Sequence, residues 1–308
     1  MTNPTTRALL GTAVTLGALA SPVRPAVAQS VYVETGNQQF GTIDLATGTF
    51  RQIGPTLAVG VQGFAPGPSG AFLTLEFSGN LVTLNRTTGR TAIIGPTGLR
   101  DCSTPTSPCG PTSVNTLVGL GGAVYVTDLQ NTLYHVDPVT GAATRIGATG
   151  MPSVSFVPHA PIPGDLDGSF GIYDQAMFGA RGALYATFDA GTLDPTTGAV
   201  TPIGVPGLYR IDPRTGATML VGAIPFGLGG VADVGGTFYA FDNFTGQIMT
   251  LDLTTGSTRA VGTFDEATTG PVAGAYAAAA TVPEPATVAL TGLGLVGAVG
   301  LRRRARRA

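Results

Sequence analysis

The 308-residue chain has no tryptophan and no lysine, and it contains only two cysteines and two histidines. Rings of metal-binding cysteine or histidine residues are therefore excluded, because such sites need several of these side chains. Only 11% of the residues are charged, whereas 43% are hydrophobic and 46 are glycine. A chain of this composition can bury a substantial core, and its many turn-forming residues predict an all-β protein.

The positive charges are unevenly distributed: all 16 basic residues are arginines, and five of them lie in the last seven positions. Residues 31–280 therefore carry nine arginines against 17 acidic residues, a net charge of −8. A surface with this excess of negative charge repels a phosphate backbone, which argues against nucleic acid as a partner.

A short pattern recurs six times along the chain: Asp or Asn, two variable residues, Thr-Gly, four further residues, then Ile or Val followed by Gly. The acidic or amide side chain accepts backbone N–H groups in a tight turn, and glycine adopts the positive φ that precedes the next strand. The pattern predicts a hairpin turn followed by a strand. Its copies begin at Asp44, Asn85, Asp137, Asp194, Asp212 and Asp252.

Each copy belongs to a larger unit of four short strands, which is clearest around the copy at Asp137. The four strands of that unit are expected at residues 118–122, 123–128, 132–137 and 142–147. Successive copies are 41 residues apart between Asp44 and Asn85 and 40 apart between Asp212 and Asp252. Four-stranded units with a period near 40 residues are typical of a β-propeller.

The repeats predict five blades, because the copy at Asp194 lies only 18 residues before Asp212 and fits an extra hairpin inserted within the fourth blade. Residues 270–277 resemble a first strand without a blade, and the blade beginning at Val31 lacks its first strand. Pairing of these two segments would close the ring and leave no exposed edge. A six- or seven-bladed propeller, a β-sandwich and a solenoid are the alternatives.

Residues 1–28 have the features of a secretory signal peptide: Arg7, an apolar stretch over 8–20, and a small-residue cleavage site at 26–28. An N-terminal membrane anchor is the alternative, although the apolar run is short and interrupted. The mature domain is expected over residues 29–281.

Export would place Cys102 and Cys109 in an oxidising compartment, where we predict a disulfide that closes a small loop. Its stabilisation would be modest, about 2 kcal/mol, because little entropy is removed from so short a loop. Two free thiols are the alternative.

The tail, residues 282–308, combines Pro283-Glu284-Pro285, an apolar segment expected to form a transmembrane helix over 286–301, and an arginine cluster over 302–307. The segment is only just long enough to span a bilayer, and the arginines favour the cytoplasmic side. These features together resemble the PEP-CTERM sorting tail.

The resemblance implies that an exosortase, a membrane-embedded processing enzyme, recognises Pro283, Glu284 and Pro285 and removes or replaces the tail. It also implies a Gram-negative bacterium that makes exopolysaccharide. The expected location is the inner membrane, with transient anchoring by the C-terminal helix, and then the periplasm, outer surface or extracellular matrix. A permanent C-terminal anchor is the alternative.

Two groups of residues are candidates for a site. The second strand of each blade ends in an acid, and hydrogen bonds within its own turn account for each better than a ring of ligands does. These acids are Glu34, Glu76, Asp128, Asp189 and Asp242.

The second group lies in the long loops 96–115 and 148–172, which are expected on one face together with the blade-four insertion. Its ionisable residues are His159, Asp165, Asp167 and Asp174. Asp165-Leu166-Asp167-Gly168 matches part of a Ca²⁺ loop but lacks the remaining ligands of an EF-hand, so a solvated turn is favoured over a metal site. No cofactor is expected, and Ca²⁺ is the alternative.

The expected function is that of a non-enzymatic, surface-destined propeller that binds or organises extracellular matrix, above all exopolysaccharide. The alternative is a hydrolase or lactonase-like propeller enzyme, which would be favoured if Asp165, Asp167 and Asp174 converged on the channel. A purely structural spacer is a third possibility. No catalytic residue is predicted, because propellers support many functions and the fold does not decide between them.

Overall fold

A computed structural model describes the body of the chain, which consists of 22 strands, a 3-10 turn η1 (Pro68–Gly70) and a four-residue helix α1 (Glu266–Thr269). The described residues are 29–99, 114–128, 130–151, 172–174, 176–193, 200–202, 204–224, 227–242 and 245–277. The all-β prediction is confirmed. Within these ranges, no helix is long and apolar enough to cross a membrane. The segments predicted as signal peptide and transmembrane helix lie outside them.

The first and last described strands pair with each other. Strand β1 (Ser30–Thr35) pairs antiparallel with β2 (Phe40–Asp44), which in turn pairs with β3 (Phe50–Gln52). On its other side, β1 pairs antiparallel with β22 (Val272–Ala277), from the opposite end of the body. The predicted pairing of the two ends is therefore confirmed.

Four further groups of four antiparallel strands follow in chain order, and the strands of each group pair with their neighbours. The second group contains β4 (Val61–Pro66), β5 (Phe72–Glu76), β6 (Asn80–Leu84) and β7 (Thr91–Pro96). The third contains β8 (Val114–Leu120), β9 (Ala123–Asp128), β10 (Thr132–Val136) and β11 (Ala143–Ala148). The fourth contains β13 (Met177–Ala180), β14 (Ala183–Leu193), β16 (Gly207–Ile211) and β17 (Thr218–Ala223). The fifth contains β18 (Leu228–Val234), β19 (Thr237–Asp242), β20 (Gln247–Leu251) and β21 (Thr258–Thr263).

The fourth group has an additional hairpin, as the sequence predicts. Strand β14 continues beyond its pairing with β16 and pairs with β15 (Val200–Pro202). Its distal part also pairs with β12 (Ile172–Asp174), a strand that the sequence did not predict.

The first strand of the third group differs from its predicted position. It was expected at residues 118–122, but β8 begins at Val114 and ends at Leu120. Gly121 and Gly122 have φ values of +60° and +85°, so they form the turn to β9 instead.

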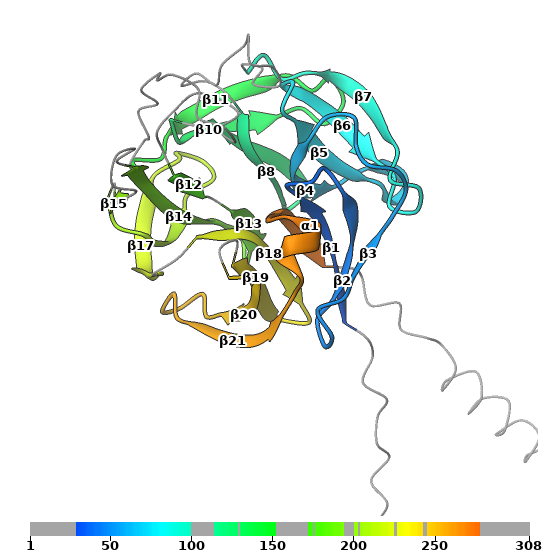
Figure 1. Ribbon diagram of the computed structural model, residues 1–308. Coiled ribbons are helices and arrows are strands. Elements are labelled where there is room, and N and C mark those ends of the chain that lie inside the picture. The colour runs from blue at the N-terminus through cyan, green and yellow to red at the C-terminus, as the bar shows by residue number, and fades with distance from the viewer. Residues whose placement is uncertain are drawn as a thin grey trace, which may run out of the picture.

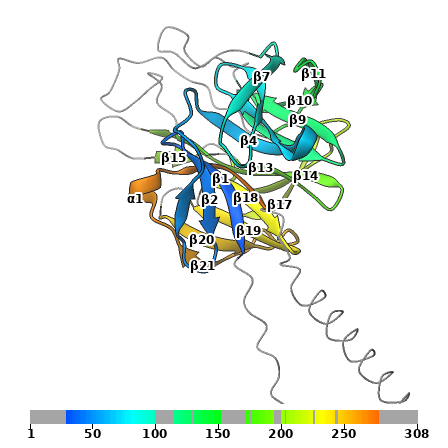
Figure 2. The same ribbon diagram turned by 90° about the vertical axis from the view of Figure 1, so that its right-hand side faces the viewer.

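The groups surround a common centre in a propeller-like arrangement (Figure 1; Figure 2). The innermost strands β22, β4, β8, β13 and β18 contact one another in this cyclic order. A single parallel pair, Phe64 opposite Val118, joins β4 to β8.

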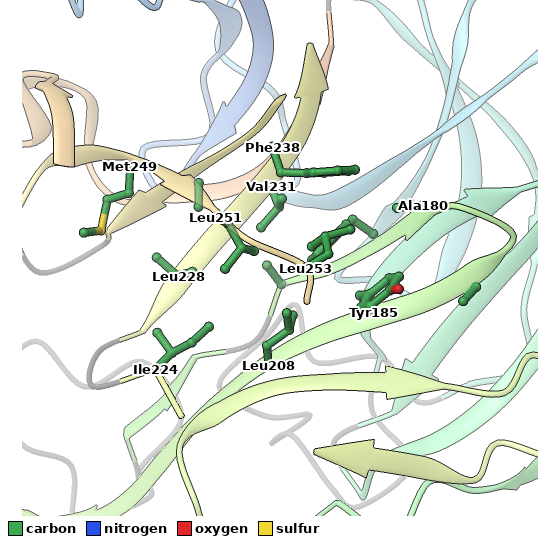
Figure 3. Close-up of a cluster of buried hydrophobic side chains, with 14 residues drawn as sticks. Ala180, Tyr185, Leu208, Ile224, Leu228, Val231, Phe238, Met249, Leu251 and Leu253 are labelled. Atoms are coloured by element: carbon green, nitrogen blue, oxygen red, sulfur yellow. The ribbon is translucent and has the colours of Figure 1, made fainter. Parts of the chain in front are cut away.

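The hydrophobic core lies between neighbouring sheets. One cluster contains Tyr185 and Leu208 of the fourth group and Leu228, Val231 and Phe238 of the fifth (Figure 3). Comparable clusters bring together residues of the other neighbouring groups. Each sheet is thus held by burial of apolar side chains against the next sheet.

The recurring turns form as predicted. In the first copy, Asp44 Oδ1 accepts the backbone N–H groups of Ala46 and Thr47, at 2.9 and 3.0 Å, and Gly48 has a φ of +70°. In the second, Asn85 accepts N–H groups from the two corresponding positions. The copy at Asp194 lies outside the described residues.

The two glycines of the repeat also join neighbouring groups at the outer rim. A Cβ atom added to Gly95, at the end of β7, would overlap the carbonyl oxygen of Thr140 in the next group. Conversely, a Cβ on Gly141 would lie 2.5 Å from the carbonyl oxygen of Gly95. Equivalent contacts recur around the rim, including one between Gly48 and Thr263 that joins the first group to the fifth.

Candidate functional site

Two of the five acids at the ends of the second strands, Asp128 and Asp242, are structural. Asp128 is buried and accepts backbone N–H groups from Gln130 and Thr132, at 3.0 and 2.8 Å, as well as the Tyr134 hydroxyl at 3.0 Å. Burial raises the pKa of the Asp128 carboxyl, although these hydrogen bonds oppose the shift. Asp242 likewise accepts an N–H group from its own turn. The structural interpretation is confirmed for these two residues.

Glu34 differs from them. Its side chain is 1% exposed, and its Oε2 atom has no hydrogen-bond partner among the described residues. It accepts a hydrogen bond from the backbone of Val61, on the neighbouring group, whereas the sequence predicted a donor in its own turn. Burial raises the pKa of the Glu34 carboxyl well above its usual value, so folding favours the protonated form.

A cavity of about 440 Å³ lies between the five inner strands. Its wall includes at least one glycine from each strand, and these glycines allow the strands to lie close together: a Cβ on Gly274 of β22 would lie 2.9 Å from the amide nitrogen of Gly63. The remaining wall is largely apolar. Among the described residues that line it, Asp233 carries the single carboxylate.

A smaller cavity of about 300 Å³ adjoins the first, because Gly119, Gly179, Asp233 and Tyr276 line both. We call it the vestibule. It adds Arg181 to the lining, beside the turn from β13 to β14. The guanidinium of Arg181 lies 5.7 Å from the ring centre of Phe238.

An aromatic cluster continues from the vestibule toward the first and second groups. The ring of Tyr276 contacts that of Phe72 edge-on, with centroids 5.1 Å apart. Arg86 lies over both Phe72 and Tyr32, 4.9 and 4.8 Å from their ring centres. Burial raises the pKa of the Tyr276 hydroxyl, and the positive charge of Arg86 opposes this shift.

Most of the residues predicted for a ligand or metal site fall outside the described part of the chain. This applies to His159, Asp165 and Asp167 and to the predicted cysteine pair, Cys102 and Cys109.

Asp174 is the exception, because it ends β12 and lies opposite Asp189 of β14 in the strand register. Whether Asp165, Asp167 and Asp174 converge thus stays untested. In the ranges that the structure describes, no group of three or more His, Cys, Asp or Glu residues could hold a metal ion.

Sequence reasoning missed the vestibule, which joins residues far apart in the chain. Arg181, Asp233 and Tyr276 come from three different groups of strands. One signal was present: the turn containing Arg181-Gly182 corresponds to turns that read Gly121-Gly122 and Gly235-Gly236 in other groups. An aligned set of repeats would have marked Arg181 as a charged residue at a position that is glycine or serine in the other turns.

Comparison with known proteins gives one family match. The PEP-CTERM protein-sorting motif matches residues 281–304, the segment that contains Pro283, Glu284 and Pro285. No curated protein matches the chain.

Several solved structures resemble the body. The nidogen/laminin complex shows 11% identity and a TM-score of 0.47, over 82% of this chain and 98% of that one. The PQQ-bound aldose sugar dehydrogenase of Streptomyces coelicolor shows 14% identity and a TM-score of 0.39, over 70% of this chain and 63% of that one. Virginiamycin B lyase of Staphylococcus aureus shows 11% identity and a TM-score of 0.33, over 78% and 71%. At this level of similarity, no functional argument is based on them.

The sorting motif has a direct implication for destination and processing. Motifs of this kind mark exported bacterial proteins for the cell surface, and an exosortase processes them. The chain thus carries a PEP-CTERM sorting motif at residues 281–304 and is an exosortase-sorted surface protein with an all-β, propeller-like body.

Proposed function

We propose that the chain is a five-bladed β-propeller that binds extracellular polysaccharide at the cell surface and catalyses no reaction. The observation that carries this proposal is the sorting motif over residues 281–304, which directs the body to the place where such polymers are found. The segment 286–301 anchors the chain in the membrane until an exosortase acts.

Three features support the count of five blades. The strands form five groups of four, the inner strands contact one another in a closed cycle, and β1 pairs with β22. Closure of this kind pairs the inner edges that an open array would leave exposed.

The central cavity supports a binding role. Its volume of about 440 Å³ falls within the range of small-molecule sites, and packed sheets surround it on all sides. Aromatic rings and arginines near its mouth supply the mixture of apolar and polar contacts that sugars require. A rigid wall of this kind loses little entropy when a ligand binds.

The test is co-sedimentation of the protein with exopolysaccharide from the producing cell, first with Ca²⁺ and then with chelator. A neutral polysaccharide from another source is the control. We expect saturable binding to the cell's own polymer. Loss of binding on chelation would show that binding requires Ca²⁺ and would favour Asp165, Asp167 and Asp174 as its ligands. Absence of binding in both conditions would contradict the proposed function.

A further inference from the structure

The vestibule contains an arginine at a position where the backbone disfavours it. Arg181 has a φ of +49°, in the left-handed region that non-glycine residues rarely adopt. The equivalent turns at 121–122 and 235–236 use two glycines each. The corresponding turn of the second group has Ser69, with a φ of +53°, at this position. The turn itself therefore does not require arginine, and the presence of a long cationic side chain at this disfavoured φ points to a role for the side chain.

The side chain is held in place but keeps its hydrogen-bonding capacity. Arg181 is exposed, and its guanidinium lies over the buried ring of Phe238. A cation over an aromatic face is attracted to it without using its N–H donors. Within the described part of the chain, no hydrogen bond or ion pair occupies these donors.

Two further polar side chains, Asp233 and Tyr276, line the vestibule. Asp233 Oδ1 accepts the backbone N–H of Gly236 at 2.8 Å, which fixes the carboxylate and leaves acceptor capacity on the exposed side chain. Tyr276 is half-buried, and its edge-on contact with Phe72 holds its ring at the vestibule. A fixed cation, a fixed acceptor and an aromatic ring thus share a cavity of about 300 Å³.

We propose that the vestibule binds a sugar carboxylate, as in a uronic acid unit of an acidic polysaccharide. The guanidinium of Arg181 forms a paired hydrogen bond with the carboxylate, for which its planar donors are suited. Asp233 accepts hydrogen bonds from sugar hydroxyl groups, and the ring of Tyr276 packs against the apolar face of the sugar. This inference rests on the proposed polysaccharide binding and names its ligand and site.

The test is isothermal titration of the full-length chain with oligogalacturonate, with a maltooligosaccharide of the same length as the neutral probe. The key variant is Arg181→Gly, which removes the cation and also relieves the positive φ, so the variant folds at least as well as the parent. Ser69→Gly is the matched control, because Ser69 has a φ of +53° in the corresponding turn but no charge. Arg214→Ala removes an exposed arginine from the recurring turn that begins at Asp212.

We expect the acidic probe to bind the parent and both controls equally and the neutral probe to bind more weakly. Arg181→Gly should weaken binding of the acidic probe by about tenfold or more, as expected for loss of a paired, charge-assisted contact. Asp233→Asn should weaken it to a smaller extent. Unchanged affinity in Arg181→Gly would overturn the proposal. Equal losses in Arg181→Gly and Arg214→Ala would also overturn it, because they would indicate general charge attraction.

Failure of this site and failure of the proposed function give different results. If the matrix co-sediments equally with the parent and with Arg181→Gly, polysaccharide binding stands and the vestibule is not its site. If oligogalacturonate binds through Arg181 but the matrix does not co-sediment, the site stands and the matrix function is wrong. If neither binds, both are wrong.

Discussion

At the residue scale, the most unusual group is the buried carboxyl of Glu34. It sits between the first and second groups, accepts one backbone hydrogen bond from Val61, and has a second oxygen without a partner among the described residues. Ionisation of such a group costs the full desolvation of a charge, which only the Val61 N–H offsets. The protonated form is therefore the stable one in the folded chain.

This environment predicts that Glu34 makes the stability of the folded protein fall as the pH rises above the usual pKa of a glutamate. Its pKa is raised from a usual value of 4.5, so its contribution is fully present below pH 4.5 and is lost as the pH rises through the folded pKa. Glu34→Gln removes the ionisation but keeps an oxygen that can accept from Val61. We expect the free energy of unfolding to fall less between pH 5 and pH 8 in the variant than in the parent. Urea unfolding at both pH values measures this, and equal changes in the two proteins would contradict it.

At the scale of single elements, the recurring turn has two separate roles. Within its own group it reverses the chain, with Asp or Asn as acceptor and glycine at positive φ. Between groups it packs against the glycine at the end of the preceding outer strand, as Gly141 does against Gly95. The packing between groups, and not the turn alone, thus explains why the pattern has two glycines.

Two glycines of the third group can separate these roles. Gly141 and Gly122 have nearly the same φ, +84° and +85°, but only Gly141 lies against a neighbouring backbone. Gly122→Ala should lower the free energy of unfolding by about 1 kcal/mol, from the unfavourable φ alone. Gly141→Ala should lower the free energy of unfolding by about 1 to 3 kcal/mol more than Gly122→Ala does, because the added methyl displaces the carbonyl of Gly95. Chemical unfolding of both variants is the measurement, and equal losses of stability would show that the rim contact contributes nothing.

The sequence predicted the strands well but not the residues that meet in space. The turn pattern placed β9 and β19 because Asp, Gly and alternating apolar residues act locally. Local signals could not find the vestibule, because Arg181 and Asp233 are brought together only when separate groups pack around the centre. Nor could they find Val61 as the partner of Glu34.

At the scale of the whole molecule, β22 is the last described strand of the body, and it pairs with the first, β1. It pairs with β1 and contacts β18 and β4, so three sheets depend on it. Val272 is fully buried there. Without β22, the edge of β1 that pairs with it would be open, and open strand edges are sites of aggregation.

Truncation tests this dependence. A chain that ends at residue 271 lacks β22, whereas one that ends at 281 keeps it, and both lack the sorting tail. We expect the longer chain to unfold in one transition and the shorter chain to aggregate or to lose about 10 °C or more in Tm. Scanning calorimetry and gel filtration distinguish them. Equal Tm values and a monomeric shorter chain would argue against closure through β22.

The sorting motif makes a prediction for the whole protein in its cell. Replacement of Pro283, Glu284 and Pro285 by alanine removes the motif within the matched segment, including the two prolines that disfavour helix formation. We expect the unprocessed chain to accumulate in the membrane fraction, whereas the parent reaches the surface. Immunoblots of cell fractions measure both species. Normal processing of the variant would show that an exosortase does not read this motif here.

The pairing of β1 with β22 also fixes where the tail leaves the body. Ala277 lies opposite Val31, and the preceding residue, Tyr276, lines the vestibule. Pro283 follows Tyr276 by seven residues, a span of at most about 25 Å. In the proposed function, a chain that its tail still anchors in the membrane would hold the vestibule near the lipid surface, where a long polymer has little room to enter. On that proposal, cleavage by an exosortase would also uncover the proposed sugar site, and the protein would bind its ligand only after it leaves the membrane.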